Sequence, residues 1–115
     1  MTTAKFEKGV EFISMTVRGH AGFAELGKDP VCAGASVLAM TVAQCVDNMH
    51  CEGKLKKKPS ITVRNGRVSV VAKPKPEHFS EALHTFYVGE IGMQILSEVY
   101  PESVQLIPFA TPDEG

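Results

Sequence analysis

Two side chains of the types that thiol chemistry needs stand close together in the N-terminal third of the chain. His20 and Cys32 are separated by a short glycine-containing stretch. The thiolate is the attacking form of cysteine, and a neighbouring imidazole can take the thiol proton and later protonate the leaving group. The two residue types at this spacing therefore favour nucleophilic catalysis by Cys32.

The residues around Cys32 predict that it lies in the first turn of a helix. Asp29 is a good N-cap and Pro30 suits the first helical position. Unpaired N–H groups and the positive end of the helix dipole favour an anion there, which supports the thiolate. Ser36 follows Cys32 by one turn on the same face. Apolar residues then recur at helical spacing, at Val31, Ala35, Leu38, Val42, Val46 and Met49.

Two short strings of sequence carry a family resemblance. They are Gly-His-Ala at 19–21 and Asp-Pro-Val-Cys-Ala-Gly-Ala-Ser at 29–36. Together they resemble the ribosomal-processing cysteine protease (Prp) family, whose pattern is Gly-His-Ala, a loop, and Asp-x-Val-Cys-Ala followed by a small residue and Ser. Pro30 departs from that pattern, which carries an aliphatic residue at this position.

The resemblance implies a function and a set of site residues. His20 and Cys32 match the catalytic pair, and Asp29 and Ser36 match the supporting acidic and hydroxyl positions. It implies a single protease domain over 1–115, a homodimer and no cofactor. The implied substrate is a large-subunit ribosomal protein precursor, from which a short N-terminal extension is removed.

The loop from Ala21 to Lys28 is expected to close over a bound peptide. Gly22 and Gly27 give it conformational freedom. Phe23 and Leu26 are candidate contacts to an apolar substrate side chain. Alternatively, these two residues simply pack the loop onto the domain.

The remaining pattern predicts an α+β fold in which two helices cover a small, mainly antiparallel sheet, in the order β-β-α-β-β-α-β. Asn65-Gly66 between β-branched runs is typical of a hairpin. The expected elements are strands at 3–6 and 10–18, a helix at 31–52, strands at 60–64 and 67–73, a helix after Pro76 that Pro101 ends, and a strand at 103–108.

Composition and charge bound the possible partners. Hydrophobic residues make up 43% of the 115 residues, charged residues make up 22%, and the formal net charge is −1. This charge argues against a general nucleic-acid binder. No run approaches the ~18 apolar residues of a membrane span, and the N-terminus lacks the apolar core of a signal peptide. We therefore expect a cytoplasmic protein with no membrane or nucleic-acid partner.

Three further features have competing interpretations. Cys45 is expected in the core, and no metal site is expected from Cys51 and His50, because no paired short cysteine spacing accompanies them. An odd number of cysteines, three, fits reduced thiols. The lysine run Lys54 to Lys58 is of a kind that can bind nucleic acid, but it is interpreted as a solvated loop next to a helix C-terminus. Alternatively, it is a patch that steers the protein to a ribosomal surface or an acidic partner.

Two other functions compete with the ribosomal protease. One is a related phage or prophage processing protease that acts on a capsid or scaffold protein. The other is a non-enzymatic dimeric adaptor of the same fold, in which Cys32 is only a small residue at a helix start. A fast-reacting thiol favours either protease over the adaptor.

Overall fold

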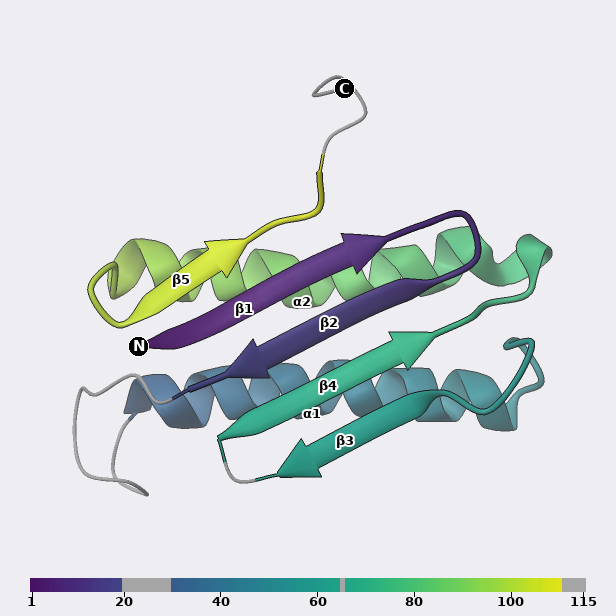
Figure 1. The fold of residues 1–115 in the computed structure, drawn as a ribbon, viewed down its shortest axis with the longest axis horizontal. Coiled ribbons are helices and arrows are strands. Elements are labelled where there is room, and N and C mark those ends of the chain that lie inside the picture. Colours follow the sequence, from purple (N-terminus) through teal and green to yellow (C-terminus); the bar gives the residue numbers. More distant parts are fainter. Residues whose placement is uncertain (20–29, 65, 111–115) are drawn as a thin grey trace.

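The computed structural model describes residues 1–19, 30–64 and 66–110, which form one sheet and two long helices (Figure 1). In chain order the elements are β1 (Thr2–Lys8), β2 (Ile13–Arg18), α1 (Pro30–Cys51), β3 (Ser60–Arg64), β4 (Arg67–Ala72), the 3-10 turn η1 (Pro76–His78), α2 (Phe79–Val99) and β5 (Val104–Ile107). This order and the α+β class are those predicted from the sequence.

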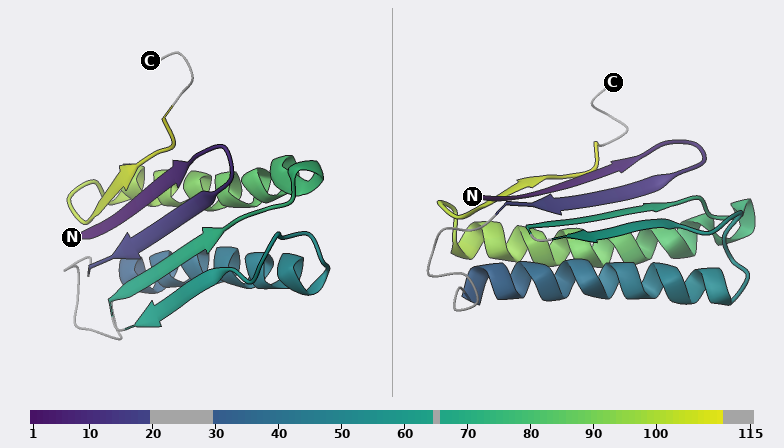
Figure 2. Two further views of the ribbon diagram at one scale, coloured as in Figure 1. Left: turned by 45° about the vertical axis from the view of Figure 1, so that its right-hand side comes forward. Right: turned by 60° about the horizontal axis from the view of Figure 1, so that its bottom comes forward.

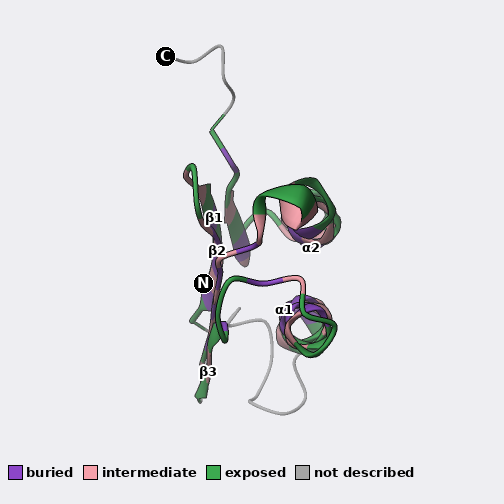
Figure 3. Cartoon of the chain, turned by 90° about the vertical axis from the view of Figure 1, so that its right-hand side faces the viewer, coloured by how far each residue is buried: buried purple, intermediate pink, exposed green. Residues whose placement is uncertain are grey.

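The five strands lie in the order β3-β4-β2-β1-β5. All neighbours are antiparallel except β1 and β5, which are parallel. Both helices cover the same face of the sheet, side by side, and Figures 2 and 3 show this two-layer arrangement from other directions. No helix of the described residues lies on the other face of the sheet.

Alternation along the strands explains which face is covered. In β2 the buried residues Ile13, Met15 and Val17 point toward the helices, and the residues between them point away. Phe6 of β1 and Phe86 of α2 are among the largest fully buried side chains. The core therefore fills the space between the sheet and the two helices.

Two glycines let the helices approach each other closely. A Cβ added to Gly89 would come within 2.6 Å of Val42 Cγ2, and one added to Gly92 would come within 2.6 Å of Leu38 Cδ2. The structure shows that they are close-packing positions.

The C-terminal end of α1 is closed by a hydrogen-bonded glycine turn. Gly53 has φ +75°, its N–H donates to the His50 carbonyl at 3.0 Å, and the Lys54 N–H donates to the Met49 carbonyl at 3.0 Å. This pair of bonds is the Schellman arrangement, which glycine favours. This turn explains why the helix, expected at 31–52, ends at Cys51.

The second strand begins three residues later than predicted. The second strand was expected to begin at Val10, but β2 begins at Ile13 and Val10 is 95% exposed. The Gly9 N–H donates to the Phe12 carbonyl at 2.9 Å, so these residues form the turn between β1 and β2. The β-branched character of Val10 could not reveal this, because the turn depends on backbone pairing.

Helix α1 is long and apolar enough, by length and composition alone, to cross a membrane. Its buried residues, however, pack in the core, at Val31, Ala35, Ala39, Val42, Ala43, Val46 and Met49. We therefore interpret α1 as a core helix of this fold.

Gly19 ends β2 in a conformation that only glycine adopts easily, with φ +92°. A Cβ at this position would also overlap the Met1 carbonyl oxygen. We predict that Gly19→Ala lowers the free energy of unfolding, measured with urea, by more than about 1 kcal/mol.

Gly53→Ala provides the matched control for this prediction. Gly53 has a similar φ of +75°, but nothing lies within 4 Å of a Cβ added there. Its substitution should cost only the backbone strain, about 1 kcal/mol. If the two variants lose the same free energy of unfolding, the overlap with the Met1 carbonyl oxygen adds nothing to the cost of Gly19→Ala.

Candidate active site

Cys32 lies in the first turn of α1, as the sequence predicted, and its side chain is half-buried. The preceding residue anchors this turn, since Val31 is fully buried in a small cluster with Val104, which Leu96 and Tyr100 also contact. These contacts tie the start of α1 to the end of α2 and to β5. Cys32 is thus presented by a fixed helix terminus.

The residues that follow Cys32 separate a buried side of α1 from an exposed one. Ala35 is buried, whereas Ser36 is exposed. Ser36 lies one helical turn after Cys32, so its hydroxyl can reach the same solvent region. The supporting role of Ser36 stays a prediction.

The exit of β2 and the start of α1 lie at the same end of the molecule (Figure 1). The Gly19 N–H donates to the Gly66 carbonyl at 2.8 Å, which ties the exit of β2 to the β3–β4 hairpin turn. The fold therefore brings the exit of β2 to the end of the molecule at which α1 and Cys32 begin.

The other predicted site residues lie outside the described residues. These are His20, Gly22, Phe23, Leu26, Gly27 and Asp29. The separation of His20 from Cys32 and the capping by Asp29 stay predictions. Within the described residues, the first turn of α1 contains no acidic side chain that would oppose a thiolate.

Sequence reasoning missed the contacts that place the site. The Gly19–Gly66 hydrogen bond and the cluster around Val31 join segments that are far apart in the chain. Gly19 itself could have been singled out, since a glycine directly after a strand is typical of positive φ. Its hydrogen-bond partner Gly66 could not have been predicted, because no local sequence pattern specifies it.

Cys45 is not in the core as expected. It is half-buried and lines a shallow groove of about 170 Å³ between α1 and α2, together with His84 and Val88. Gly89, whose lack of a side chain brings the helices together, lines the same groove. In the described ranges no three His, Cys, Asp or Glu side chains gather into a group that could hold a metal ion.

Comparison with known proteins identifies relatives over nearly the whole chain. The family model described as "Cysteine protease Prp" matches residues 1–105. No curated protein sequence matches. The fold is similar to that of the ribosomal processing protease Prp from S. aureus, solved with a covalently linked product peptide, with a TM-score of 0.68 and 23% identity over 96% of this chain and 100% of that one.

Two further solved structures have the same fold. A second structure of the S. aureus protease, solved with a substrate peptide, has a TM-score of 0.60 and 23% identity, covering 96% of this chain and 100% of that one. SMU.848 from Streptococcus mutans has a TM-score of 0.64 and 23% identity, covering 96% of each chain.

Helix α1 carries an internal control for thiol reactivity. Cys32 lies in its first turn, and Cys51, which is exposed, is its last residue. The helix dipole favours a thiolate at the first position and disfavours it at the second. We predict that iodoacetamide at neutral pH modifies Cys32 before Cys51 and Cys45, as followed by peptide mass spectrometry.

The exposed position of Cys51 makes this comparison demanding. Accessibility alone would make Cys51 the first thiol to react. If Cys51 reacts first in the folded protein, Cys32 is not an activated nucleophile. Rates that become equal in urea would show that the difference depends on the fold.

Proposed function

The chain belongs to the Prp family of cysteine proteases, and we propose that it is a cytoplasmic endopeptidase that removes a short N-terminal extension from a large-subunit ribosomal protein precursor. The observation that carries the proposal is the position of Cys32 in the anchored first turn of α1, within the segment that the family model matches. The S. aureus relative supports it, since that protein is a ribosomal processing protease solved with a substrate peptide.

The proposed chemistry starts from the Cys32 thiolate. His20 accepts the thiol proton, and Cys32 Sγ forms a bond to the scissile carbonyl carbon. The backbone N–H groups of the first turn of α1 stabilise the negative charge on the carbonyl oxygen. The intermediate then collapses, His20 gives the proton to the leaving amine, and the C–N bond breaks to leave a thioester on Cys32.

Water completes the cycle. His20 takes a proton from a water molecule, and the resulting hydroxide attacks the thioester carbonyl. The C–S bond breaks, the thiolate is reformed, and the N-terminal fragment leaves with a new carboxylate. In this proposal Asp29 caps α1 and orients His20, Ser36 supports the bound peptide, and Phe23 and Leu26 contact an apolar side chain of the substrate.

We predict that His20→Ala and Cys32→Ala each lower cleavage of the precursor by at least about 10³-fold. Because the two side chains act as one unit, the double variant should be no worse than either single variant. Ser36→Ala should only weaken cleavage, and Asp29→Ala should also cost about 1 kcal/mol of stability through the lost cap. Intact-mass analysis of the candidate precursor measures each effect.

Cys51→Ala is the matched control, because it removes a thiol from the other end of the same helix. It should leave cleavage unchanged. A Cys32→Ala variant that still processes the precursor would remove the proposed mechanism. A native protein that cleaves a capsid or scaffold protein in place of the ribosomal precursor would assign a phage client.

We also propose that the protein acts as a homodimer formed through α2. Four exposed apolar residues follow one another at spacings of three or four along this helix: Val88, Ile91, Ile95 and Val99, at 55%, 55%, 55% and 61% exposure. They lie opposite the buried residues Phe86 and Met93 on the helical wheel. A continuous exposed apolar stripe of this kind is typical of an association surface.

We predict that Ile91→Glu converts the dimer to a monomer, because a buried unpaired carboxylate opposes association. Sedimentation equilibrium measures the change. Val10→Glu is the control, since Val10 is exposed but lies in the β1–β2 turn and not on the apolar stripe of α2. A native protein that is monomeric at all accessible concentrations would contradict the dimer.

A further inference from the structure

The charge of this protein is distributed unevenly along its sequence. The segment 54–76 contains none of the 13 acidic residues and eight of the 12 basic ones: Lys54, Lys56, Lys57, Lys58, Arg64, Arg67, Lys73 and Lys75. This segment comprises the β3–β4 hairpin and the two chain segments that flank it. The net charge of −1 therefore conceals a strongly basic part of the molecule.

One face of the β3–β4 hairpin packs under α1, and its other face lies on the side of the sheet that neither α1 nor α2 covers (Figure 3). Cα pairing brings Arg18 of β2 beside Arg67 of β4, and Arg67 beside Arg64 of β3. Directly paired residues point to the same side of a sheet, and Val68, which follows Arg67, points into the core. The three arginines therefore form a row across three strands on the open face, and all three are exposed.

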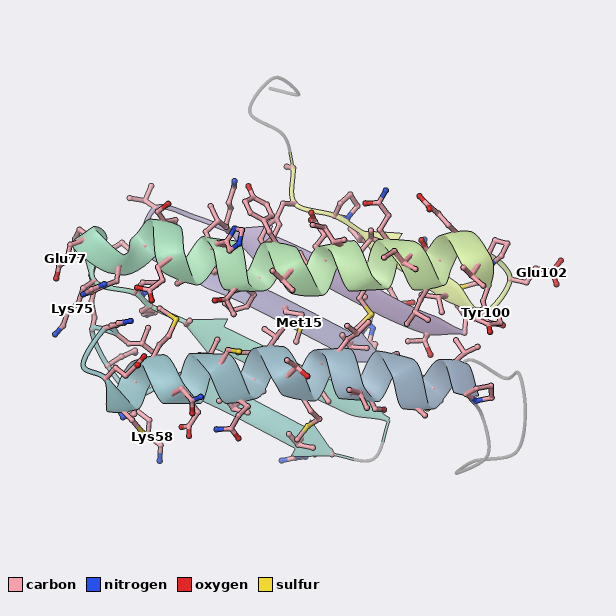
Figure 4. The ribbon with its side chains drawn as sticks, turned by 180° about the vertical axis from the view of Figure 1, so that it is seen from behind. Met15, Lys58, Lys75, Glu77, Tyr100 and Glu102 are labelled. Atoms are coloured by element: carbon pink, nitrogen blue, oxygen red, sulfur yellow. The ribbon has the colours of Figure 1, made fainter. Side chains whose placement is uncertain are left out.

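A lysine cluster occupies the opposite end of the same hairpin. Lys57, Lys58 and Lys73 line a hollow of about 410 Å³ together with Ser60 and Val71. Ser60 pairs with Val71 in the register of β3 and β4, and both belong to the open-face set of the alternating pattern. Figure 4 shows Lys58 and Lys75 at the end of the molecule opposite Tyr100.

Hydroxyl groups connect the two clusters. Thr16, Ser69 and Thr62 pair across β2, β4 and β3 in a row between the arginines and the lysine hollow. From Ser60 to Arg64 the strand extends ~13 Å, so the basic surface runs the length of the hairpin. We name the set of Arg18, Arg64, Arg67, Lys57, Lys58 and Lys73, with these hydroxyls, the open-face basic surface.

Several other cations of this region already have partners. Lys54 forms an ion pair with Glu81 at 2.7 Å, and this hydrogen bond raises the pKa of Lys54 and lowers the pKa of Glu81. Lys56 lies 3.6 Å from Glu11. By contrast, no carboxylate of the described residues lies within 4.0 Å of a cation of the open-face basic surface.

A solvated sheet face alone does not explain this arrangement. Like charges that face each other on neighbouring strands destabilise a sheet, and an ordinary solvated face mixes both signs. On β1 the open face does carry such a mixture, since Lys5 lies 3.6 Å from Glu7. The arginine row, which carries positive charge only, is therefore a feature that folding does not require.

We propose that the open-face basic surface binds the phosphate backbone of RNA. The arginines and lysines neutralise phosphates, and the serine and threonine hydroxyls can donate to phosphate oxygens or pair with 2′-hydroxyl groups. On β1–β4 this face carries no aromatic side chain to stack on bases, so binding should be largely independent of sequence. This proposal departs from the expectation of no nucleic-acid partner, for which the net charge of the whole chain was the argument.

The choice of RNA over an acidic protein rests on the proposed function, in which the client is a ribosomal protein precursor. It also rests on how the basic side chains are distributed over the surface. A basic surface that continues along a whole hairpin, with Val71 as its one apolar side chain on β3 and β4, suits a polymer charged at every unit. An acidic peptide would also present apolar side chains, and Val71 is the one apolar side chain that β3 and β4 offer them on this surface.

The test measures binding of a short fluorescein-labelled polyuridine RNA to the native protein by fluorescence anisotropy across a range of salt concentrations. Arg64→Gln/Arg67→Gln should weaken binding at least tenfold at low salt, and it should reduce the slope of log K against log salt by about 0.7 for each lost phosphate contact. The melting temperature should not fall, because the substitution relieves repulsion between neighbouring arginines.

Lys8→Gln/Lys54→Gln is the matched control, since it removes two charges that contact Tyr87 and Glu81 respectively. It should weaken binding much less than the arginine variant. No binding by the native protein, or equal loss in the two double variants, would overturn the proposal. So would displacement of the RNA by polyglutamate of equal charge concentration, which would assign the surface to acidic proteins.

Two further measurements separate RNA binding from DNA binding, and RNA binding from proteolysis. Oligothymidylate should bind more weakly than polyuridine because it lacks 2′-hydroxyl groups, and equal or tighter DNA binding would overturn the assignment to RNA. Cys32→Ala should bind RNA as the native protein does. A protein that cleaves its precursor but does not bind RNA refutes only the RNA surface, and one that binds RNA but does not cleave refutes only the protease.

Discussion

The structure depends on the burial of one face of a five-stranded sheet beneath two helices. Every second residue of β1, β2 and β4 contributes to this core, and α1 and α2 close over it with glycines at their contact. Because burial of apolar surface is the main favourable term in folding, this layer fixes the position of α1. The position of α1 in turn fixes Cys32, whose neighbour Val31 is fully buried.

The two ends of α1 have different chemical characters. Its first turn presents N–H groups that favour an anion, and there the chain carries Cys32. Its last turn is closed by Gly53, after which the lysine-rich loop begins. At ~1.5 Å per residue, the 22 residues of α1 separate the two ends by about 33 Å. Cys32 and the lysine hollow thus lie near opposite ends of α1, whereas the arginine row lies at the same end of the molecule as Cys32, on the sheet face that the two helices do not cover.

The molecule also divides its two faces between different kinds of contact. The helix layer exposes the apolar stripe of α2, which we assign to a second copy of the chain, and the sheet layer exposes the open-face basic surface. Pairing through α2 would leave the uncovered sheet face of each copy pointing outward. A dimer of this kind would present two basic surfaces.

The sequence by itself determined the order of the elements, the helix start that carries Cys32 and the glycine turn that ends the helix. These features are local: an apolar residue every third or fourth position, a proline at a first turn and a glycine after a last one each act within a few residues. The family resemblance at 19–21 and 29–36 is local in the same way, and the family model that matches residues 1–105 agrees with it. Only the tertiary structure decided that Val10 lies in a turn, that Cys45 lines a groove, and that Arg18 stands beside Arg67 and Arg64. Strand register brings together residues that are far apart in the chain, so neither net charge nor spacing along the sequence could show that the basic residues gather on one face.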